Sequence, residues 1–444
     1  MEAGLLSAVD AAEAIRSGEM TAEELLQNTL QRIEQLEPDI GAWQHLDTDV
    51  ALEQARQADL ARRSGRSTGP LNGVPIGIKD IIDTADYPCE YGTVLRQGRR
   101  PPDDAFLISK LREAGTIILG KTVTTELAVY APGKTRNPYN TDHTPGGSSS
   151  GSAAAVACGM VPLAVGTQTN GSVIRPASYC GVFGFKPSFG GISRSGVLSQ
   201  SKPLDTVGIF ARDLQDLALL ADVLMVYDAG DRSMRPAAKP QITQELGVQP
   251  PIEPRLAFVR TPMWDLAEET TKDAFRELIE HANGRIDIVD LPAEFDHAVD
   301  DLGCIMKVDL ARSYDRYYRQ GKDSLSDKLV EIIEGGQKIL ARDYMDALER
   351  IDMYNLLLNE IFFDYDAILT PSTTAEAPLA DSTGDPVFCS IWSLCGVPAL
   401  NLPIFIGEKN LPFGAQLVGQ RGDDARLFRT AGWLLNMLDQ PNSD

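Results

Sequence analysis

Apolar residues recur at helical spacing near the start of the chain. Thr21-Ala22-Glu23-Glu24 has the spacing of a capping box, which marks the first turn of a helix. The apolar positions that follow lie three or four residues apart: Leu26, Leu30, Ile33 and Leu36. The pattern predicts an amphipathic helix that ends at Pro38, and a shorter helix over residues 8–17 before it.

Farther along, short apolar runs alternate with segments of helical pattern. We predict strands over residues 71–80, 116–119 and 161–165, and helices over residues 106–114 and 153–158. This order is typical of α/β proteins, which place ligands at the ends of their strands. A glycine-rich turn follows the third of these strands, so we expect a site there.

The second half of the chain has a different pattern. Residues 228–254 are rich in Pro, Gln and Gly and indicate a surface excursion rather than a domain linker. Residues 265–357 read as mostly helical, whereas residues 367–371 and 399–403 are typical of buried strands that end in loops. We find no internal repeat and no low-complexity tract.

Charge limits the possible partners. The chain has 444 residues, and 63 Asp and Glu against 41 Lys and Arg give a formal net charge of −22. Such a chain repels nucleic acid and anionic membranes, so we expect neither as a partner. Its longest weakly polar stretch, residues 153–166, is too short to cross a bilayer. Because Met1–Leu6 lacks the basic and apolar regions of a signal peptide, we expect a cytoplasmic protein.

The cysteines and the known ligand motifs point away from metals and cofactors. Six cysteines are scattered without a Cys-x-x-Cys pair, which argues for reduced thiols in the core: Cys89, Cys158, Cys180, Cys304, Cys389 and Cys395. The sequence has no His-Glu-x-x-His, no paired Cys/His cluster, no Asp-rich calcium loop and no phosphate-binding glycine motif. We therefore expect neither a metal nor a cofactor.

Two serines in glycine-rich segments carry the candidate chemistry. Ser148 lies in residues 146–152 and Ser172 ends residues 166–172, with Lys79 upstream. Acyl transfer needs an activated hydroxyl, a proton donor for the leaving group, and N–H dipoles that face the developing oxyanion. Glycine lets consecutive N–H groups converge, so residues 169–172 are predicted to form an oxyanion loop that ends in its own nucleophile.

Lys79 is predicted to be the base of this chemistry. It would lie at the inner end of the strand in residues 71–80, with apolar neighbours that favour its burial: Ile76, Ile78, Ile81 and Ile82. Burial disfavours the charged form of a lysine, so its pKa falls and the neutral amine becomes usable near neutral pH.

A competing interpretation uses a different serine. Gly147–Gly151 fits the Gly-x-Ser-x-Gly nucleophile elbow, which would make Ser149 the attacking group. That mechanism needs a histidine after the serine, and His281 and His297, which follow it, lie in no site-like context. Serine acyl transfer with a lysine base is the better match.

These segments together resemble the amidase signature family. The resemblance is carried by residues 77–80, 145–154, 171–177 and 185–188, in the order and spacing of that family. It implies one α/β domain over residues 1–444, with a mixed, largely parallel central sheet covered by helices on both faces. The signature core would span about residues 70–215, and a variable substrate-pocket region about residues 228–410.

The resemblance also implies roles for individual residues. Ser172 would attack the substrate, Ser148 with a cis peptide bond would relay protons, and Lys79 would be the terminal base. The oxyanion would be held by four backbone N–H groups, those of Thr169, Asn170, Gly171 and Ser172. Three further residues would support the site: Ser149, Gln168 and Arg175. No cofactor is implied.

Two residues depart from the usual family pattern. Gln168 stands where Asp is usual, so it cannot form an ion pair with Arg175, and its support must come from the hydrogen bonds of a neutral amide. Arg175 itself would be a structural or substrate-positioning residue, or else a surface arginine. Asn170 stands where Gly is usual, and because Asn tolerates left-handed angles we expect the loop to keep its shape.

The sequence therefore predicts an amidohydrolase that cleaves the C–N bond of small amides, with aryl amides, esters and carbamates as candidate substrates. It would act as a monomer or homodimer, and weak candidates for its pocket are Tyr130, Met306, Trp392 and Phe413. Two alternatives stay open. One is a catalytically silent binding or scaffold protein with this fold, and the other is the glutaminase subunit of a tRNA-dependent amidotransferase.

Overall fold

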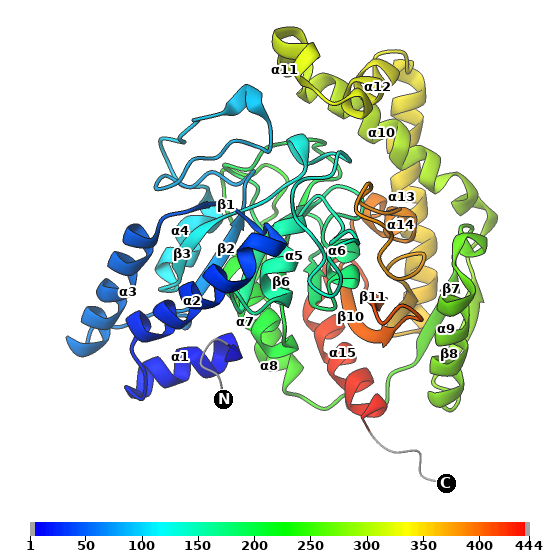
Figure 1. The fold of residues 1–444 in the computed structure, drawn as a ribbon. Coiled ribbons are helices and arrows are strands. Elements are labelled where there is room, and N and C mark those ends of the chain that lie inside the picture. The colour runs from blue at the N-terminus through cyan, green and yellow to red at the C-terminus, as the bar shows by residue number, and fades with distance from the viewer. Residues whose placement is uncertain (1–4, 440–444) are drawn as a thin grey trace.

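A single sheet forms the centre of the protein (Figure 1). The computed structural model describes residues 5–439, so residues 1–4 of the stretch Met1–Leu6 lie outside it. Within the described residues the sheet has eleven strands in the order β1-β3-β2-β4-β6-β5-β10-β11-β9-β7-β8. The strands are β1 Trp43–Leu46, β2 Pro75–Lys79, β3 Ile117–Thr122, β4 Leu163–Gln168, β5 Phe183–Lys186, β6 Thr206–Ala211, β7 Leu256–Arg260, β8 Ile286–Asp290, β9 Ala367–Pro371, β10 Ala399–Ile406 and β11 Pro412–Val418.

Helices pack on both faces of this sheet, as expected. Successive residues of a strand point to opposite faces. On β5, a Cβ at Gly184 would lie 2.5 Å from Ala177 Cβ of α6, whereas the ring of the next residue, Phe185, packs on Phe428 of α15. The helices are α1 Ala8–Ser17, α2 Ala22–Ile40, α3 Thr48–Arg63, α4 Phe106–Glu113, α5 Ser150–Ala157, α6 Ile174–Tyr179, α7 Leu214–Leu224, α8 Ile242–Leu246, α9 Glu269–His281, α10 Ala298–Ser313, α11 Asp315–Gly321, α12 Asp327–Gly336, α13 Ala341–Asp364, α14 Val387–Leu394 and α15 Asp424–Leu438.

The sheet is mixed, as predicted, but the expectation that it is largely parallel is wrong. Four neighbouring pairs are parallel, namely β2–β3, β2–β4, β7–β8 and β7–β9. The other six described pairs are antiparallel. The physical reason is visible at β10 and β11, which are joined by a short turn over residues 407–411, because strands joined by a tight turn must run in opposite directions.

Local patterns predicted several of these elements. The helix over residues 8–17 and the strand over residues 367–371 have the predicted bounds, and the capping box of Thr21 and Glu24 is formed. The end of α2 at Pro38 is wrong, because the helix continues to Ile40. A proline this close to the C-terminal end removes only one N–H, and Gly41, with φ of +63°, ends the helix instead.

Elements in the second half were harder to predict. Residues 265–357 are mostly helical, but β8 lies among them at one edge of the sheet, where Ile286 is buried and the next four residues alternate between half-buried and exposed. β10 extends to Ile406, and β4 begins at Leu163 rather than at residue 161.

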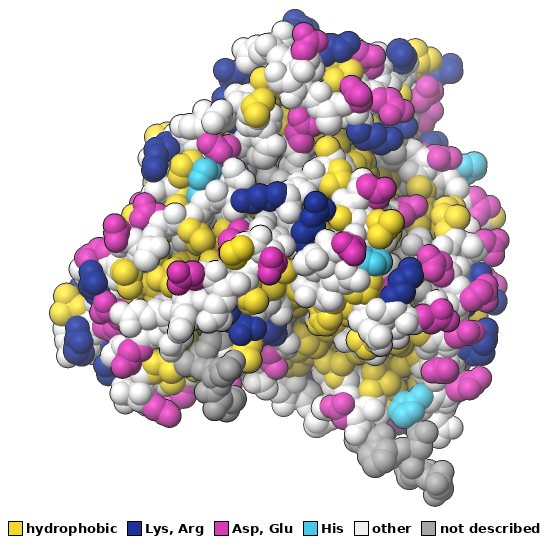
Figure 2. All heavy atoms as spheres, viewed as in Figure 1, with side chains coloured by type: hydrophobic (Ala, Val, Ile, Leu, Met, Phe, Trp, Pro, Cys, Tyr) yellow, Lys and Arg dark blue, Asp and Glu magenta, His cyan; other side chains and the backbone are white. Residues whose placement is uncertain are grey.

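All six cysteines are free, five of them buried, as expected. Acidic and basic side chains are interspersed over the face in Figure 2, so the net charge forms no single patch there. No helix in residues 5–439 is both long enough and apolar enough to span a membrane.

Candidate active site

Lys79 is the last residue of β2 and lies in the interior. Its side chain has 0% exposure. Nζ donates hydrogen bonds to Ser148 Oγ at 2.7 Å and to Thr167 Oγ1 of β4 at 2.8 Å. Burial holds the pKa of Lys79 well below its usual value, and the negative charge of Asp205 opposes this shift. The structure therefore provides a lysine whose charged form is disfavoured by burial, in direct contact with one of the predicted serines.

The serines of residues 148–152 each have a different partner. The peptide bond between Gly147 and Ser148 is cis, as the resemblance implies. Ser149 Oγ lies 3.2 Å from both the N and the O of Thr167, and so links the loop to β4. Ser152 Oγ donates to Val165 O at 2.9 Å on the same strand. These bonds hold the loop against β4 and leave the Ser148 hydroxyl facing Lys79.

Gln168 shapes the turn that carries Ser172. Its Oε1 accepts from the N–H groups of Val173 and Ile174, at 2.8 and 3.0 Å, where α6 begins. Its Nε2 donates to Ser393 Oγ of α14 at 2.9 Å. The side chain thus supports the start of α6, and its described hydrogen bonds do not go to Arg175.

Arg175 is 1% exposed, so the alternative of a surface arginine is wrong. Its guanidinium donates to the carbonyl oxygens of Gly147 at 2.6 Å and Gly384 at 2.5 Å. It thereby joins α6, which follows Ser172, to the residue that precedes Ser148. This contact ties the two serine segments together.

Thr169 and Asn170 begin the predicted oxyanion loop. The Thr169 hydroxyl lies 2.5 Å from Gln200 Oε1 and 2.7 Å from Asp205 Oδ1. Ser390 Oγ donates to Asn170 Oδ1 at 2.9 Å, and Ser393 Oγ donates to the Asn170 main-chain oxygen. Asn170 does not have the left-handed conformation that its tolerance would allow, because the described non-glycine residues with positive φ are Tyr91, Leu127, Ala128, Asn283 and Asn410.

Ser172 follows Gly171 at the start of α6 and is partly exposed, whereas Ser148 and Lys79 are buried. A Cβ at Gly171 would lie 2.8 Å from Pro386 Cβ, so a larger residue there would collide with the start of α14. The loop is therefore enclosed by α14 on one side, while Ser172 remains partly exposed.

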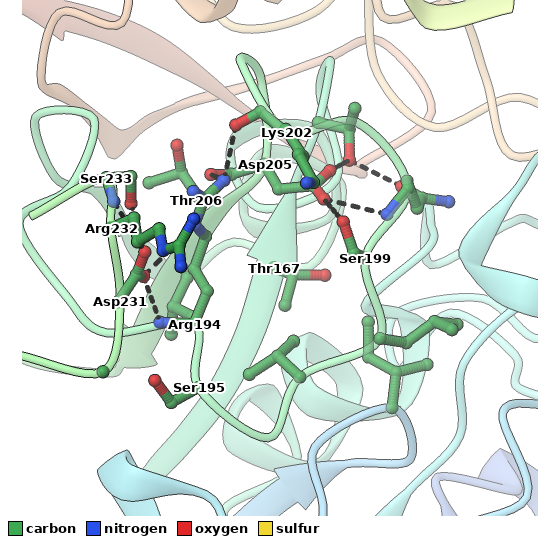
Figure 3. Close-up of a pocket in the computed structure, with 17 residues that line it drawn as sticks. Thr167, Arg194, Ser195, Ser199, Lys202, Asp205, Thr206, Asp231, Arg232 and Ser233 are labelled. Atoms are coloured by element: carbon green, nitrogen blue, oxygen red, sulfur yellow. Dashed lines mark hydrogen bonds and ion pairs between the residues drawn. The ribbon is translucent and has the colours of Figure 1, made fainter. Parts of the chain in front are cut away.

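A cavity of about 550 Å³ lies beside this site (Figure 3). Thr167 and Thr169 line it, and so do Asp205, Arg194 and Asp231, which come from other segments of the chain. Burial raises the pKa of Asp205 to about 6, although hydrogen bonds from Thr169 and from backbone N–H groups oppose the shift. Thr167, one of the two residues whose hydroxyls bond Lys79, thus also lines this cavity.

The four weak pocket candidates lie in different surroundings. Tyr130 is half-buried, and Asn170 Nδ2 lies 3.5 Å from its hydroxyl. Trp392 is buried on α14, and Met306 is buried on α10. Phe413 packs on Phe405 with ring centroids 5.0 Å apart and belongs to the core. Of the four, Tyr130 has a described contact with the predicted loop.

Sequence reasoning missed several residues that contact the candidate site, namely Thr167, Gln200, Asp205, Ser390 and Ser393. Ser390 and Ser393 are hydroxyls one turn apart on a largely apolar helix, and this spacing was the signal available. Within residues 5–439, no group of three or more His, Cys, Asp or Glu side chains is arranged to hold a metal ion.

The chain matches known proteins over nearly its whole length. The Amidase family matches residues 24–428. A glutamyl-tRNA(Gln) amidotransferase subunit from Chloroflexus aggregans is 34% identical over 458 residues, covering 94% of this chain and 93% of that protein. The solved peptide amidase from Stenotrophomonas maltophilia has a TM-score of 0.84 at 28% identity, covering 97% of this chain and 96% of that chain.

A further solved structure gives the same fold. It belongs to a vestigial protein complex that reveals the evolutionary origins of an s-triazine catabolic enzyme, and it has a TM-score of 0.92 at 25% identity, covering 97% of this chain and 98% of that chain. With the match over residues 24–428, these similarities place the chain in the Amidase family, and its class of activity is that of an amidohydrolase.

Proposed function

We propose that this protein hydrolyses the C–N bond of small amides through an acyl-enzyme on Ser172. The observation that carries the proposal is the environment of Lys79, which is fully buried and is held by two hydroxyl groups, one of them Ser148 Oγ at 2.7 Å. A buried amine in its neutral form is a base, and the neighbouring serine gives it a path for protons.

In the proposed mechanism, neutral Lys79 takes the proton of Ser148 while Ser148 takes that of Ser172. Ser172 Oγ then bonds to the substrate carbonyl carbon, and the carbonyl oxygen becomes an oxyanion held by the N–H groups of residues 169–172. The proton returns through Ser148 to the departing amine as the C–N bond breaks. Water repeats the sequence on the acyl-enzyme, which releases the acid and restores Ser172.

The proposed substrates are small aryl or primary amides, with esters and carbamates as further members. The whole chain, residues 1–444, would act as one domain, in the form of a monomer or homodimer. The similarity to a peptide amidase supports a small amide substrate.

The 34% identity to a subunit of a glutamyl-tRNA(Gln) amidotransferase favours the second candidate, a glutaminase that delivers ammonia to a partner protein. A silent scaffold is the third candidate, because Gln168 and Asn170 depart from the usual pattern.

The test is hydrolysis of a panel comprising an aryl amide, a primary amide, glutamine, an aryl ester and an aryl carbamate. We expect Ser172→Ala to lower kcat by roughly 10⁴-fold or more, and Lys79→Ala by about 10²- to 10⁴-fold. A fluorophosphonate should label the wild type but not Ser172→Ala. Turnover of glutamine alone, with a partner protein that co-purifies, would favour the glutaminase. A folded wild type with neither turnover nor labelling would favour the scaffold.

A further inference from the structure

Two serines of α14 hold the two oxygen atoms of Asn170. Ser393 Oγ donates to the main-chain oxygen, and Ser390 Oγ donates to Oδ1 of the side chain at 2.9 Å. The two serines are three residues apart and so lie on one face of a helix whose residues are all buried. One helix therefore controls both the backbone and the side chain of Asn170, two residues before Ser172.

Fixing the Asn170 carbonyl also fixes the N–H of the next residue. A peptide unit is planar, and in the trans form its C=O and N–H point in opposite directions. In residues 5–439 the one cis peptide bond is Gly147–Ser148, so the Asn170–Gly171 unit is trans. When Ser393 draws the Asn170 oxygen toward α14, the Gly171 N–H must point away from α14.

We propose that Ser393 is a positioning residue that aims the Gly171 N–H at the oxyanion, and that Gln168 sets the direction of its hydrogen bond. This inference rests on the proposed function, in which the Gly171 N–H stabilises the oxyanion. Hydrogen-bond donors help catalysis most when they are fixed in place before charge develops, and one donor of this kind contributes about 10²- to 10³-fold.

The chemistry of Gln168 supports this direction. Its Oε1 already accepts from Val173 and Ile174, so its Nε2 faces Ser393 and can only donate. Ser393 Oγ accepts that bond and has a single hydrogen of its own, which goes to the Asn170 oxygen. A carboxylate at position 168 would instead attract the Ser393 hydrogen and release the carbonyl.

Packing keeps the loop close to α14. A Cβ at Gly171 would lie 2.8 Å from Pro386 Cβ and 3.3 Å from Cys389 Sγ. The loop therefore rests against the first turn of α14 and has little room to rotate. Gln168 and Asn170 thus both bond α14, but only the bond from Ser393 to the Asn170 main-chain oxygen acts on the peptide unit that carries the Gly171 N–H.

The test compares Ser393→Ala with Ser390→Ala on the best amide of the panel. Ser393→Ala should lower kcat by about ten- to a hundredfold, because a misdirected donor loses part of its effect, with KM within about twofold. Ser390→Ala frees the Asn170 side chain but not its carbonyl, so its kcat should stay within about threefold of wild type. Ser393→Thr, which keeps the hydroxyl, should restore kcat.

Gln168→Glu provides a second route that leaves Ser393 in place. Glutamate keeps the acceptor for Val173 and Ile174 but cannot donate to Ser393, so kcat should fall as in Ser393→Ala. The double variant with Ser393→Ala and Gln168→Glu should lose no more kcat than either single variant, because both substitutions act through the hydrogen bond from Ser393 to the Asn170 oxygen. The rate of phosphonate labelling of Ser172 should fall with kcat, because the phosphonyl oxygen uses the same donors.

Each outcome bears on one of the two proposals. If the wild type turns over and Ser393→Ala keeps full kcat, the positioning role is wrong and the proposed function stands. Equal losses of kcat in Ser390→Ala and Ser393→Ala, in step with a lower Tm, would also overturn it. If the wild type neither turns over nor labels, the proposed function fails and takes this inference with it. Should Ser393→Ala not fold, Gln168→Glu decides.

Discussion

The ends of β2 and β5 each bury a lysine, but the two lysines have different partners. Lys79 and Lys186 are the last residues of these strands, and both are essentially inaccessible to solvent. Lys79 Nζ donates to the hydroxyl oxygens of Ser148 and Thr167. Lys186 Nζ donates to the main-chain oxygens of Val397 and Pro187.

The kind of partner decides what a buried lysine can do. Burial lowers the pKa of both lysines, for Lys186 to about 8. A carbonyl oxygen only accepts hydrogen bonds, so Lys186 must remain a donor to keep its contacts. A hydroxyl can donate or accept, so neutral Lys79 can accept the proton of Ser148 without losing its partner. Burial alone therefore does not make a base.

Among the variants that test this comparison, the largest expected effect is on the turnover of Lys79→Met. We expect kcat to fall by about 10³-fold, because general-base catalysis contributes about 10²- to 10⁴-fold. The fold should remain, and at neutral pH the Tm should equal or exceed that of wild type, since the folded protein disfavours the charged amine. Steady-state kinetics and thermal unfolding check both points.

The difference in stability between Lys79→Met and the wild type should change with pH in a definite direction. The pKa of Lys79 is lower in the folded than in the unfolded chain, so the unfolded state binds more protons between the two values. Stability of the wild type should therefore rise with pH through that interval, and the advantage of Lys79→Met should shrink. A Tm difference that is constant from pH 7 to pH 10, or full activity of the variant, would contradict this account.

Lys186→Met should show the opposite behaviour. It removes the donor to two buried carbonyl oxygens, and an unsatisfied buried acceptor costs about 1–3 kcal/mol, so we expect a loss of about 2 kcal/mol in stability. The kcat of the folded protein should stay within about twofold of wild type. Denaturant unfolding and active-site titration measure the two quantities separately. A loss of kcat without a loss of stability would mean that the two regions do not differ as described.

The sequence predicted the surroundings of Lys79 because the relevant signals are local. Apolar residues around Lys79 indicated a buried strand, and glycine and serine marked the turns on either side of α5. Apart from the β10–β11 hairpin, the direction of a strand relative to its neighbours was not a local property. The predicted largely parallel sheet was wrong mainly because β6 and β10 also pair antiparallel with strands far away in the sequence.

The partners of the atypical residues could not be predicted for the same reason. Any support of Arg175 by Gln168 was expected to come from hydrogen bonds of a neutral amide. The Gln168 amide instead bonds the nearby N–H groups of Val173 and Ile174, and Ser393, which lies 225 positions away. The role of Arg175 also depended on a distant contact, with Gly384. One sequence contains the chemistry of an amide or a guanidinium but not the identity of the group that the fold brings to it.

The smallest expected effect concerns Asp205, which lines the cavity beside Lys79. Its negative charge favours the protonated form of Lys79, as Asp424 does for Lys186. Asp205→Asn removes that charge, so the pKa of Lys79 should fall further, and the acid limb of log kcat/KM should move to lower pH. The plateau should change only a few-fold, since Asn keeps a side-chain oxygen for the backbone N–H groups of Gln200 and Ser201.

Asp231→Asn is the matched control for this shift. Asp231 lines the same cavity but pairs with Arg194 at 3.4 Å, and its charge does not contribute to the pKa shift of Lys79. A profile from pH 5 to pH 10 should therefore move for Asp205→Asn and not for Asp231→Asn. Equal shifts would indicate a general effect of net charge. A shift confined to Asp205→Asn would mean that one nearby carboxylate limits how far burial lowers the pKa of Lys79. The hydroxyl partners have a separate role, because they give the neutral amine a proton to accept.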